Sequence, residues 1–120
     1  MLLSLHHIQI SIAKNGEAAA RRFYCDLLGL SEIEKPPHML KGGGLWLKLA
    51  DQQIHLGAED FAARAHTKAH LAYQVNDLEY WKVKLNQADI QFIQPVNIDG
   101  MQRILLSDPF GNKIELLELI

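Results

Sequence analysis

Residues 5–12 read LHHIQISI, and this stretch decides the fold because its pattern returns later in the chain. Ile8, Ile10 and Ile12 alternate with His7 and Gln9. Such a period of two is typical of a β-strand with one face on the core. The alternation predicts a strand over residues 3–12, and KAHLAYQV at residues 68–75 predicts a second strand of the same kind.

An amphipathic helix is expected after each of these strands. NGEAAARRFYCDLLGL at residues 15–30 has apolar side chains at helical spacing, and Gly29 stands where a helix C-terminal cap belongs. These apolar positions are Ala20, Phe23, Leu27 and Leu28. NDLEYWKVKLNQA at residues 76–88 is expected to start with Asn76 as the N-cap, with Glu79 three residues later.

Further strands complete two similar halves. They are expected at residues 42–49, 52–57, 103–108 and 113–119, with the turn DPFGN at 108–112. IQFIQPV at 90–96 makes a poor strand because of Pro95. The order of elements predicts an α+β fold of two βαβββ modules in one domain of 120 residues. The modules span about residues 1–57 and 67–120, and AEDFAARAHT at 58–67 links them.

Composition restricts the classes of function. Hydrophobic residues make up 48% of the chain and the formal net charge is −2, which fits a soluble globular protein and gives no basic stretch for nucleic acid. No apolar run is long enough to span a membrane, and MLLSLHHIQ lacks the features of a signal peptide. Cys25 is the only cysteine, which fits a reducing cytoplasm. We expect a cytoplasmic protein.

The strand faces opposite the aliphatic ones carry candidate ligands at equivalent places in the two halves. The first strand of each half contributes His7 or His70, and the last strand contributes His55 or Glu115. If a pseudo-twofold relates the halves, these four side chains converge, and three imidazoles with a carboxylate suit a divalent metal. The alternative is a polar surface without a metal.

Several motifs resemble the vicinal oxygen chelate superfamily. They are ARRFYCDLLGL, GGLWLKL, AHLAYQVNDL and DPFGNKIELLE, together with LHHIQISI, and they cover nearly the whole chain in order. This superfamily includes glyoxalase I, methylmalonyl-CoA epimerase, extradiol dioxygenases and fosfomycin- and bleomycin-resistance proteins. The resemblance implies paired βαβββ modules that curl around one divalent metal, and a homodimer in which the site is shared between subunits or built within one.

Carried over by position, His7, His70 and Glu115 resemble the metal triad of the superfamily. His55 falls where glyoxalase I has a glutamate and the epimerases have a glutamine, which makes it a probable fourth ligand. Glu115 is then the single ligand carboxylate and the candidate catalytic base. The resemblance implies one divalent metal ion, with Zn, Ni, Mn, Co and Fe as the candidates.

Four more residues share the parity of the ligands. Gln9 and Gln74 can orient a carbonyl or a water molecule. Arg103 can bind a carboxylate or phosphate, or form a surface ion pair instead. Trp46 can line the cavity or belong to ordinary core. We assign these four to substrate binding.

The resemblance implies a metal-dependent glyoxalase-like isomerase or lyase that acts on a small oxygen-rich substrate. Two alternatives stay open. An extradiol-type dioxygenase uses two histidines and one glutamate, but a fourth ligand at His55 would occupy an oxygen site. A bleomycin-resistance-like protein binds a small molecule in the same cup without catalysis. Metal content and substrate proton exchange separate these possibilities.

Overall fold

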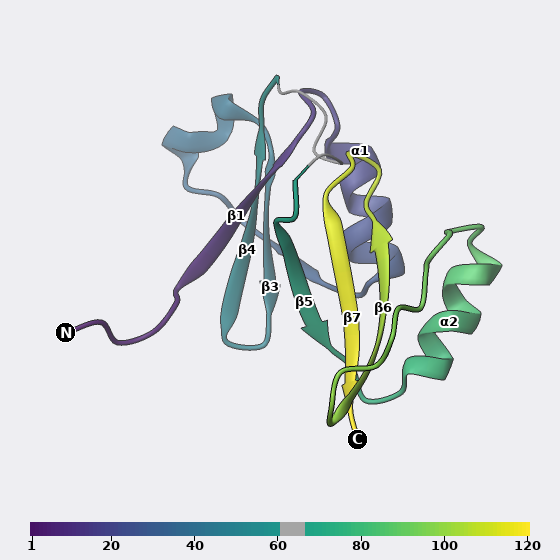
Figure 1. The fold of residues 1–120 in the computed structure, drawn as a ribbon. Coiled ribbons are helices and arrows are strands. Elements are labelled where there is room, and N and C mark those ends of the chain that lie inside the picture. The colour runs from purple at the N-terminus through teal and green to yellow at the C-terminus, as the bar shows by residue number, and fades with distance from the viewer. Residues whose placement is uncertain (61–66) are drawn as a thin grey trace. The chain divides into compact units, whose positions relative to one another are not determined.

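The computed structural model describes residues 1–60 and 67–120 (Figure 1). The chain divides into two compact units, Met1–Ala62 and Ala63–Ile120, each with one small mixed sheet. The predicted linker over 58–67 lies mostly outside the described residues, since 61–66 are not among them. The α+β class predicted from the order of elements is confirmed.

The sheet of the first unit has the order β1-β4-β3-β2. β1 (His7–Ile12) runs parallel to β4 (Gln52–Ala58), and β3 (Leu45–Leu49) runs antiparallel to both β4 and β2 (Ser31–Ile33). The prediction that the first strand starts at Leu3 was wrong. His7 pairs with Gln53 at the start of β4, so residues ahead of His6 have no neighbouring strand in this sheet.

The first helix changes its winding along its length. α1 (Glu17–Ala20) continues into η1 (Arg21–Leu27), which is π-helical. Gly29 follows the helix with φ +85°, and Leu30 N donates to the carbonyl oxygen of Tyr24 at 2.9 Å. This confirms Gly29 as the C-terminal cap, because a left-handed residue here closes the last turn.

A short connection that the sequence patterns did not resolve lies between this helix and β3. It contains β2 and the 3-10 helix η2 (Pro37–Gly42). Gly44 follows with φ +81°, and a Cβ built there would lie 2.0 Å from the carbonyl oxygen of Leu56. Only glycine allows β3 to start this close to β4.

The sheet of the second unit has the order β5-β7-β6. β5 (His70–Gln74) runs parallel to β7 (Lys113–Leu119), and β6 (Met101–Ser107) runs antiparallel to β7. The weak strand expected around Pro95 is reduced to one bridge between Ile93 and Leu105. This agrees with the missing backbone donor of proline.

α2 (Leu78–Gln87) starts one residue later than the sequence predicted. Its N-cap is Asp77, whose carboxylate accepts from Tyr80 N at 3.0 Å, so the assignment of Asn76 as N-cap was wrong. Asp77 has the extended backbone typical of an N-cap. Leu78 N donates to Glu118 Oε2 at 2.9 Å, which joins the start of α2 to β7.

The turn between β6 and β7 is closed by its own first residue. Asp108 Oδ1 accepts from the backbone N–H groups of Phe110 and Asn112 at 2.8 and 2.9 Å. Asp108 N donates to the carbonyl oxygen of Asn112 at 2.9 Å. The predicted turn at 108–112 is therefore confirmed, and it fixes how β6 and β7 pair.

The aliphatic strand faces are mostly buried, as their alternation predicts. The buried residues on these aliphatic faces are Ile12, Leu45, Leu47, Ile54, Leu56, Tyr73, Ile104, Leu106, Ile114 and Leu116. Leu49 departs from the pattern because it sits at the end of β3, where it is 41% exposed. Among the described residues, no helix has the length and hydropathy needed to cross a membrane.

Candidate functional site

Three aromatic rings form a stack on the sheet of the first unit. The His55 ring lies between Trp46, with ring centroids 4.1 Å apart, and His7, with ring centroids 4.2 Å apart. The rings are nearly parallel, at 4° and 15°. Register places the rings near one another: Trp46 lies directly opposite His55 on β3, and His7 on β1 lies opposite Gln53, two residues before His55. The structure thus brings together the two ligand candidates of this unit.

His55 is buried and held in one tautomer. Its Nε2 lies 2.9 Å from the side-chain oxygen of Gln53, which can only accept, so His55 donates from Nε2 and its lone pair lies on Nδ1. Burial, with smaller contributions from His7, His6 and Lys35, lowers the pKa of His55 below its usual value. The ring is therefore neutral near pH 7, the form that binds metals.

The stacked arrangement limits what His7 and His55 can bind together. A metal ion lies close to the plane of each imidazole that binds it. Two nearly parallel rings at 15° do not direct their lone pairs at one nearby point. In this conformation one ion is bound by only one of the two rings, and His7 is the exposed and more accessible one.

Gln9 lies in the same unit beside the stack. Its side chain crosses Gly57, where a Cβ would lie 2.6 Å from Gln9 Nε2. Glycine at position 57 therefore makes room for this amide. His6 and His7 contact each other through their Nδ1 atoms at 3.0 Å.

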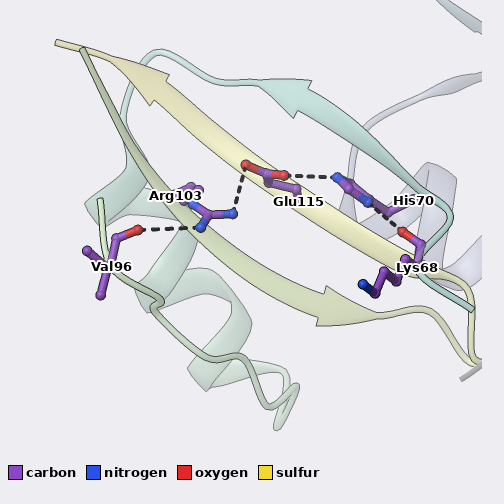
Figure 2. A network of polar contacts seen from close by, with 5 residues as sticks. All are labelled: Lys68, His70, Val96, Arg103 and Glu115. Atoms are coloured by element: carbon purple, nitrogen blue, oxygen red, sulfur yellow. Dashed lines mark hydrogen bonds and ion pairs between the residues drawn. The ribbon is translucent and has the colours of Figure 1, made fainter. Parts of the chain in front are cut away.

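The second unit presents a diagonal row of side chains across its three strands (Figure 2). His70 lies on β5, Glu115 on β7 and Arg103 on β6. Their strand partners explain the row. Opposite His70 on β7 is Lys113, two residues before Glu115, and opposite Arg103 is Leu117, two residues after it. Steps of two along β7 keep all three side chains on one face.

Both ring nitrogens of His70 lie next to oxygen atoms. Its Nδ1 lies 2.9 Å from the carbonyl oxygen of Lys68, which can only accept, so Nδ1 carries the hydrogen. Its Nε2 lies 3.1 Å from Glu115 Oε2 (Figure 2). In the neutral ring two electron-pair donors then face each other. A proton or a metal cation between them relieves this repulsion.

Glu115 is buried between two positively charged or protonatable groups. Only 8% of its side chain is exposed, whereas His70 is 42% exposed and Arg103 21% exposed. Arg103 Nη1 lies 3.7 Å from Glu115 Oε1, and Arg103 Nη2 donates to the carbonyl oxygen of Val96 at 3.4 Å. One oxygen of Glu115 thus faces His70 and the other faces Arg103.

Gln74 and Trp46 are the two remaining predicted site residues. Gln74 is exposed at the end of β5, two strand positions from Ala72, which pairs with Glu115. Trp46 is partly buried and covers one face of His55. No group of three or more His, Cys, Asp or Glu side chains suited to a metal occurs among residues 1–60 and 67–120. Each unit contributes a pair of the predicted ligands.

Two supporting contacts were not foreseen from the sequence. Gln53 holds His55, and the backbone carbonyl of Lys68 holds His70. Gln53 lies two residues before His55 on the same strand, so strand alternation could have indicated it. A backbone carbonyl leaves no such signal in the sequence.

Comparison with known proteins identifies the family. The model of the Glyoxalase/Bleomycin resistance protein/Dioxygenase superfamily matches residues 4–116. The chain therefore belongs to this superfamily, as its motifs predicted. No curated protein matches the chain.

Solved structures show the same fold. A protein from Bacillus anthracis described only by its glyoxalase family is 34% identical, with a TM-score of 0.92 over 100% of this chain and 98% of that one. A lactoylglutathione lyase from Agrobacterium tumefaciens is 21% identical, with a TM-score of 0.74 over 96% and 92%. A fosfomycin resistance protein from Listeria monocytogenes, in complex with Mn(II) and 1S,2S-dihydroxypropylphosphonic acid, is 16% identical, with a TM-score of 0.84 over 100% and 95%.

Proposed function

We propose that this protein is a metal-dependent glyoxalase-like isomerase or lyase acting on a small oxygen-rich substrate. His7, His70 and Glu115 would hold one divalent ion, Zn, Ni, Mn, Co or Fe, with His55 as a possible fourth ligand only after its ring or that of His7 turns. The proposal includes a homodimer that works in the cytoplasm.

One observation carries the metal assignment. His70 Nε2 and Glu115 Oε2 are 3.1 Å apart, with the lone pair of the neutral ring toward the carboxylate. Two neighbouring ligands at ordinary bond lengths on one ion are about 3.0–3.4 Å apart. The hydrogen bond from His70 Nδ1 to the carbonyl of Lys68 is the support that metal-binding histidines commonly have. The spacing of these two donor atoms is therefore compatible with a shared divalent metal.

A bound divalent ion would supply Lewis-acid stabilisation of negative charge on a substrate oxygen. The residues of the chain would do the rest. Glu115 Oε1, on the side away from His70, would accept a proton from the carbon next to a carbonyl and return it to the neighbouring carbon. Burial of Glu115 limits its contact with water and strengthens its electrostatic contacts.

The remaining polar residues would orient the substrate. Gln9, which crosses Gly57, and Gln74 would direct amide groups at a carbonyl oxygen or a water molecule. Trp46 would line the cavity beside His55, and Arg103 would contact the substrate next to Glu115. The relatives support this class of function, since one is a lactoylglutathione lyase and another was solved with Mn(II) and a small phosphonic acid.

The aromatic stack favours a second candidate, an extradiol-type dioxygenase. Because the parallel rings let only one of His7 and His55 reach a given ion, a ligand set without His55 consists of His7, His70 and Glu115. Two histidines and one carboxylate are the set that suits Fe(II) and oxygen. Iron in the purified protein would favour this candidate, and zinc or nickel the isomerase.

The deciding experiment is elemental mass spectrometry on untagged protein purified without chelator. About one transition-metal ion per chain is expected, because a single set of ligands is available. Solvent deuterium exchange into hydroxyacetone, followed by proton NMR, then separates catalysis from binding. Protein that holds none of these ions, even after each is added, would overturn the proposal and leave a non-catalytic small-molecule-binding protein.

A further inference from the structure

Arg103 has hydrogen-bonding capacity that the described residues do not use. Its Nε is buried and has no partner among them. Within residues 1–60 and 67–120 its terminal nitrogens make only long contacts, 3.4 Å to the carbonyl oxygen of Val96 and 3.7 Å to Glu115 Oε1 (Figure 2). Strong charge-assisted bonds of this kind are about 2.7–2.9 Å long. The guanidinium is therefore poorly satisfied.

Arg21 shows what a satisfied arginine looks like in the same chain. Its Nε donates to Glu32 Oε1 at 2.8 Å and its Nη2 donates to Glu32 Oε2 at 3.2 Å, a paired contact with both carboxylate oxygens. Its side chain is 49% exposed, so water is also available, whereas Arg103 is only 21% exposed. Arg103 thus has less water and weaker protein partners.

An arginine that served only to hold Glu115 would be expected to use its planar fork. Both oxygens of a carboxylate then bind two nitrogens at short distance, as Glu32 does with Arg21. Arg103 instead meets one oxygen of Glu115 at 3.7 Å, while the other oxygen faces His70. The fork is left available for a group that comes from outside the protein.

We propose that Arg103 binds an oxyanion group of the substrate, a carboxylate or a phosphate, beside Glu115. This inference rests on the proposed function for its place in the reaction. In the diagonal row, Arg103 lies on β6 and His70 on β5, with Glu115 between them on β7. The substrate class is then a small oxygen-rich acid whose charged group lies on the side of Glu115 away from His70.

Anion binding can be measured at the NMR signal of the Arg103 guanidinium. The Arg103 Nε–H resonance in nitrogen-15 NMR spectra of metal-free protein is followed while sodium acetate or inorganic phosphate is added at constant ionic strength. Either anion is expected to shift this resonance to saturation as the fork turns toward it. The Arg21 Nε–H resonance is the internal control, because Glu32 already occupies it. A response to acetate alone identifies a carboxylate, and a response to phosphate alone identifies a phosphate.

Matched variants test the assignment. Arg103→Gln should weaken binding of the responding anion about tenfold or more, Arg103→Lys less, and Arg21→Gln not at all. Binding is followed at backbone amides, so it is measured in every variant. No saturable response of wild-type Arg103 to either anion would overturn the proposal. So would equal anion affinity in Arg103→Gln and wild type.

The experiment also separates this inference from the proposed function. Anion binding without any uptake of metal would support the oxyanion site and contradict the metal-dependent enzyme. Metal uptake without any response at Arg103 would support the metal-dependent enzyme and contradict the oxyanion site. If Arg103→Gln fails to fold, the wild-type resonance and Arg103→Lys still decide the outcome.

Discussion

His70 Nε2 faces Glu115 Oε2 at 3.1 Å, with the hydrogen of the His70 ring committed on its other nitrogen to the carbonyl of Lys68. If the His70 ring is neutral, two acceptors face each other beside a buried carboxylate, and a cation or a proton between them relieves the repulsion. The pair is defined by one sheet alone, so it does not depend on how the two units are arranged. The first prediction follows from it.

Glu115→Gln should weaken metal binding strongly, whereas Gln9→Ala should not. The amide lacks the negative charge that holds a divalent ion next to His70, and a loss of at least about tenfold is expected. Elemental analysis after dialysis against graded chelator measures the effect. Equal retention of metal by both variants would contradict the assignment of Glu115.

His7→Ala should cost more metal affinity than His55→Ala. The near-parallel stack lets only one of the rings reach a given ion, and His55 has its Nε2 on Gln53. Visible spectra of the cobalt-substituted protein should change on removal of His7 and stay close to wild type on removal of His55. A larger change in His55→Ala would show that the stack opens when metal binds.

The free energy of unfolding should decrease at alkaline pH because of Tyr73. Burial, helped by the negative charge of Asp108, raises the pKa of Tyr73 from 10.0 to about 12. Between these values the unfolded chain releases a proton that the folded protein keeps, so the free energy of unfolding falls as pH rises, by roughly 2–3 kcal/mol in all.

Tyr73→Phe should remove that loss. Its cost at neutral pH should be small, because the buried hydroxyl has no hydrogen-bond partner among the described residues. Urea unfolding at pH 8, 10 and 11 measures both effects, with the exposed Tyr80→Phe as control. The same alkaline slope in Tyr73→Phe and wild type would refute the assignment.

Asp77→Ala should destabilise the protein by about 1 kcal/mol, the usual cost of losing an N-cap. The carboxylate that accepts from Tyr80 N is then missing and the first turn of α2 loses a partner. Asn76→Ala is the matched control and should change stability much less. Thermal unfolding of the two variants decides between neighbouring residues that the sequence alone ranked in the opposite order.

Gly44→Ala should fold poorly, and Gly42→Ala should behave like wild type. A methyl group at Gly44 would meet the carbonyl oxygen of Leu56 at 2.0 Å, whereas a Cβ at Gly42 has nothing within 4 Å. Gly44 also has a φ of +81°, a backbone conformation that favours glycine. Soluble yield and circular dichroism of the two variants test this. A well-folded Gly44→Ala would show that β3 and β4 can separate there.

The fold could be predicted from the sequence because the same strand and helix patterns occur in both halves of the chain. The apolar alternation along most strands, the Gly29 cap and the turn at Asp108 each have a local physical cause, and the structure confirms them. The errors lie at ends of elements. The strand start at Leu3 failed because β4 begins too late to pair with it, and the cap moved from Asn76 to Asp77. Both depend on partners in space.

The candidate site was predictable only in part. Strand parity indicated His7, His55, His70 and Glu115, and each unit brings its two candidates together. Parity could not reveal that the His7 and His55 rings stack, since that depends on side-chain torsions and on Trp46. Nor could it reveal the poor satisfaction of Arg103, which follows from distances to Val96 and Glu115.

The turn that Asp108 closes has a consequence for how this chain tolerates insertions and deletions. It sets Leu105 opposite Glu115, and through that register it sets Arg103 beside the carboxylate. A hairpin lengthened by one residue that slipped into the ladder would present Ile114 or Leu116 in place of Glu115. Substitutions in this hairpin leave the register unchanged, whereas a shift of a single position would replace a charged face of the sheet with an aliphatic one.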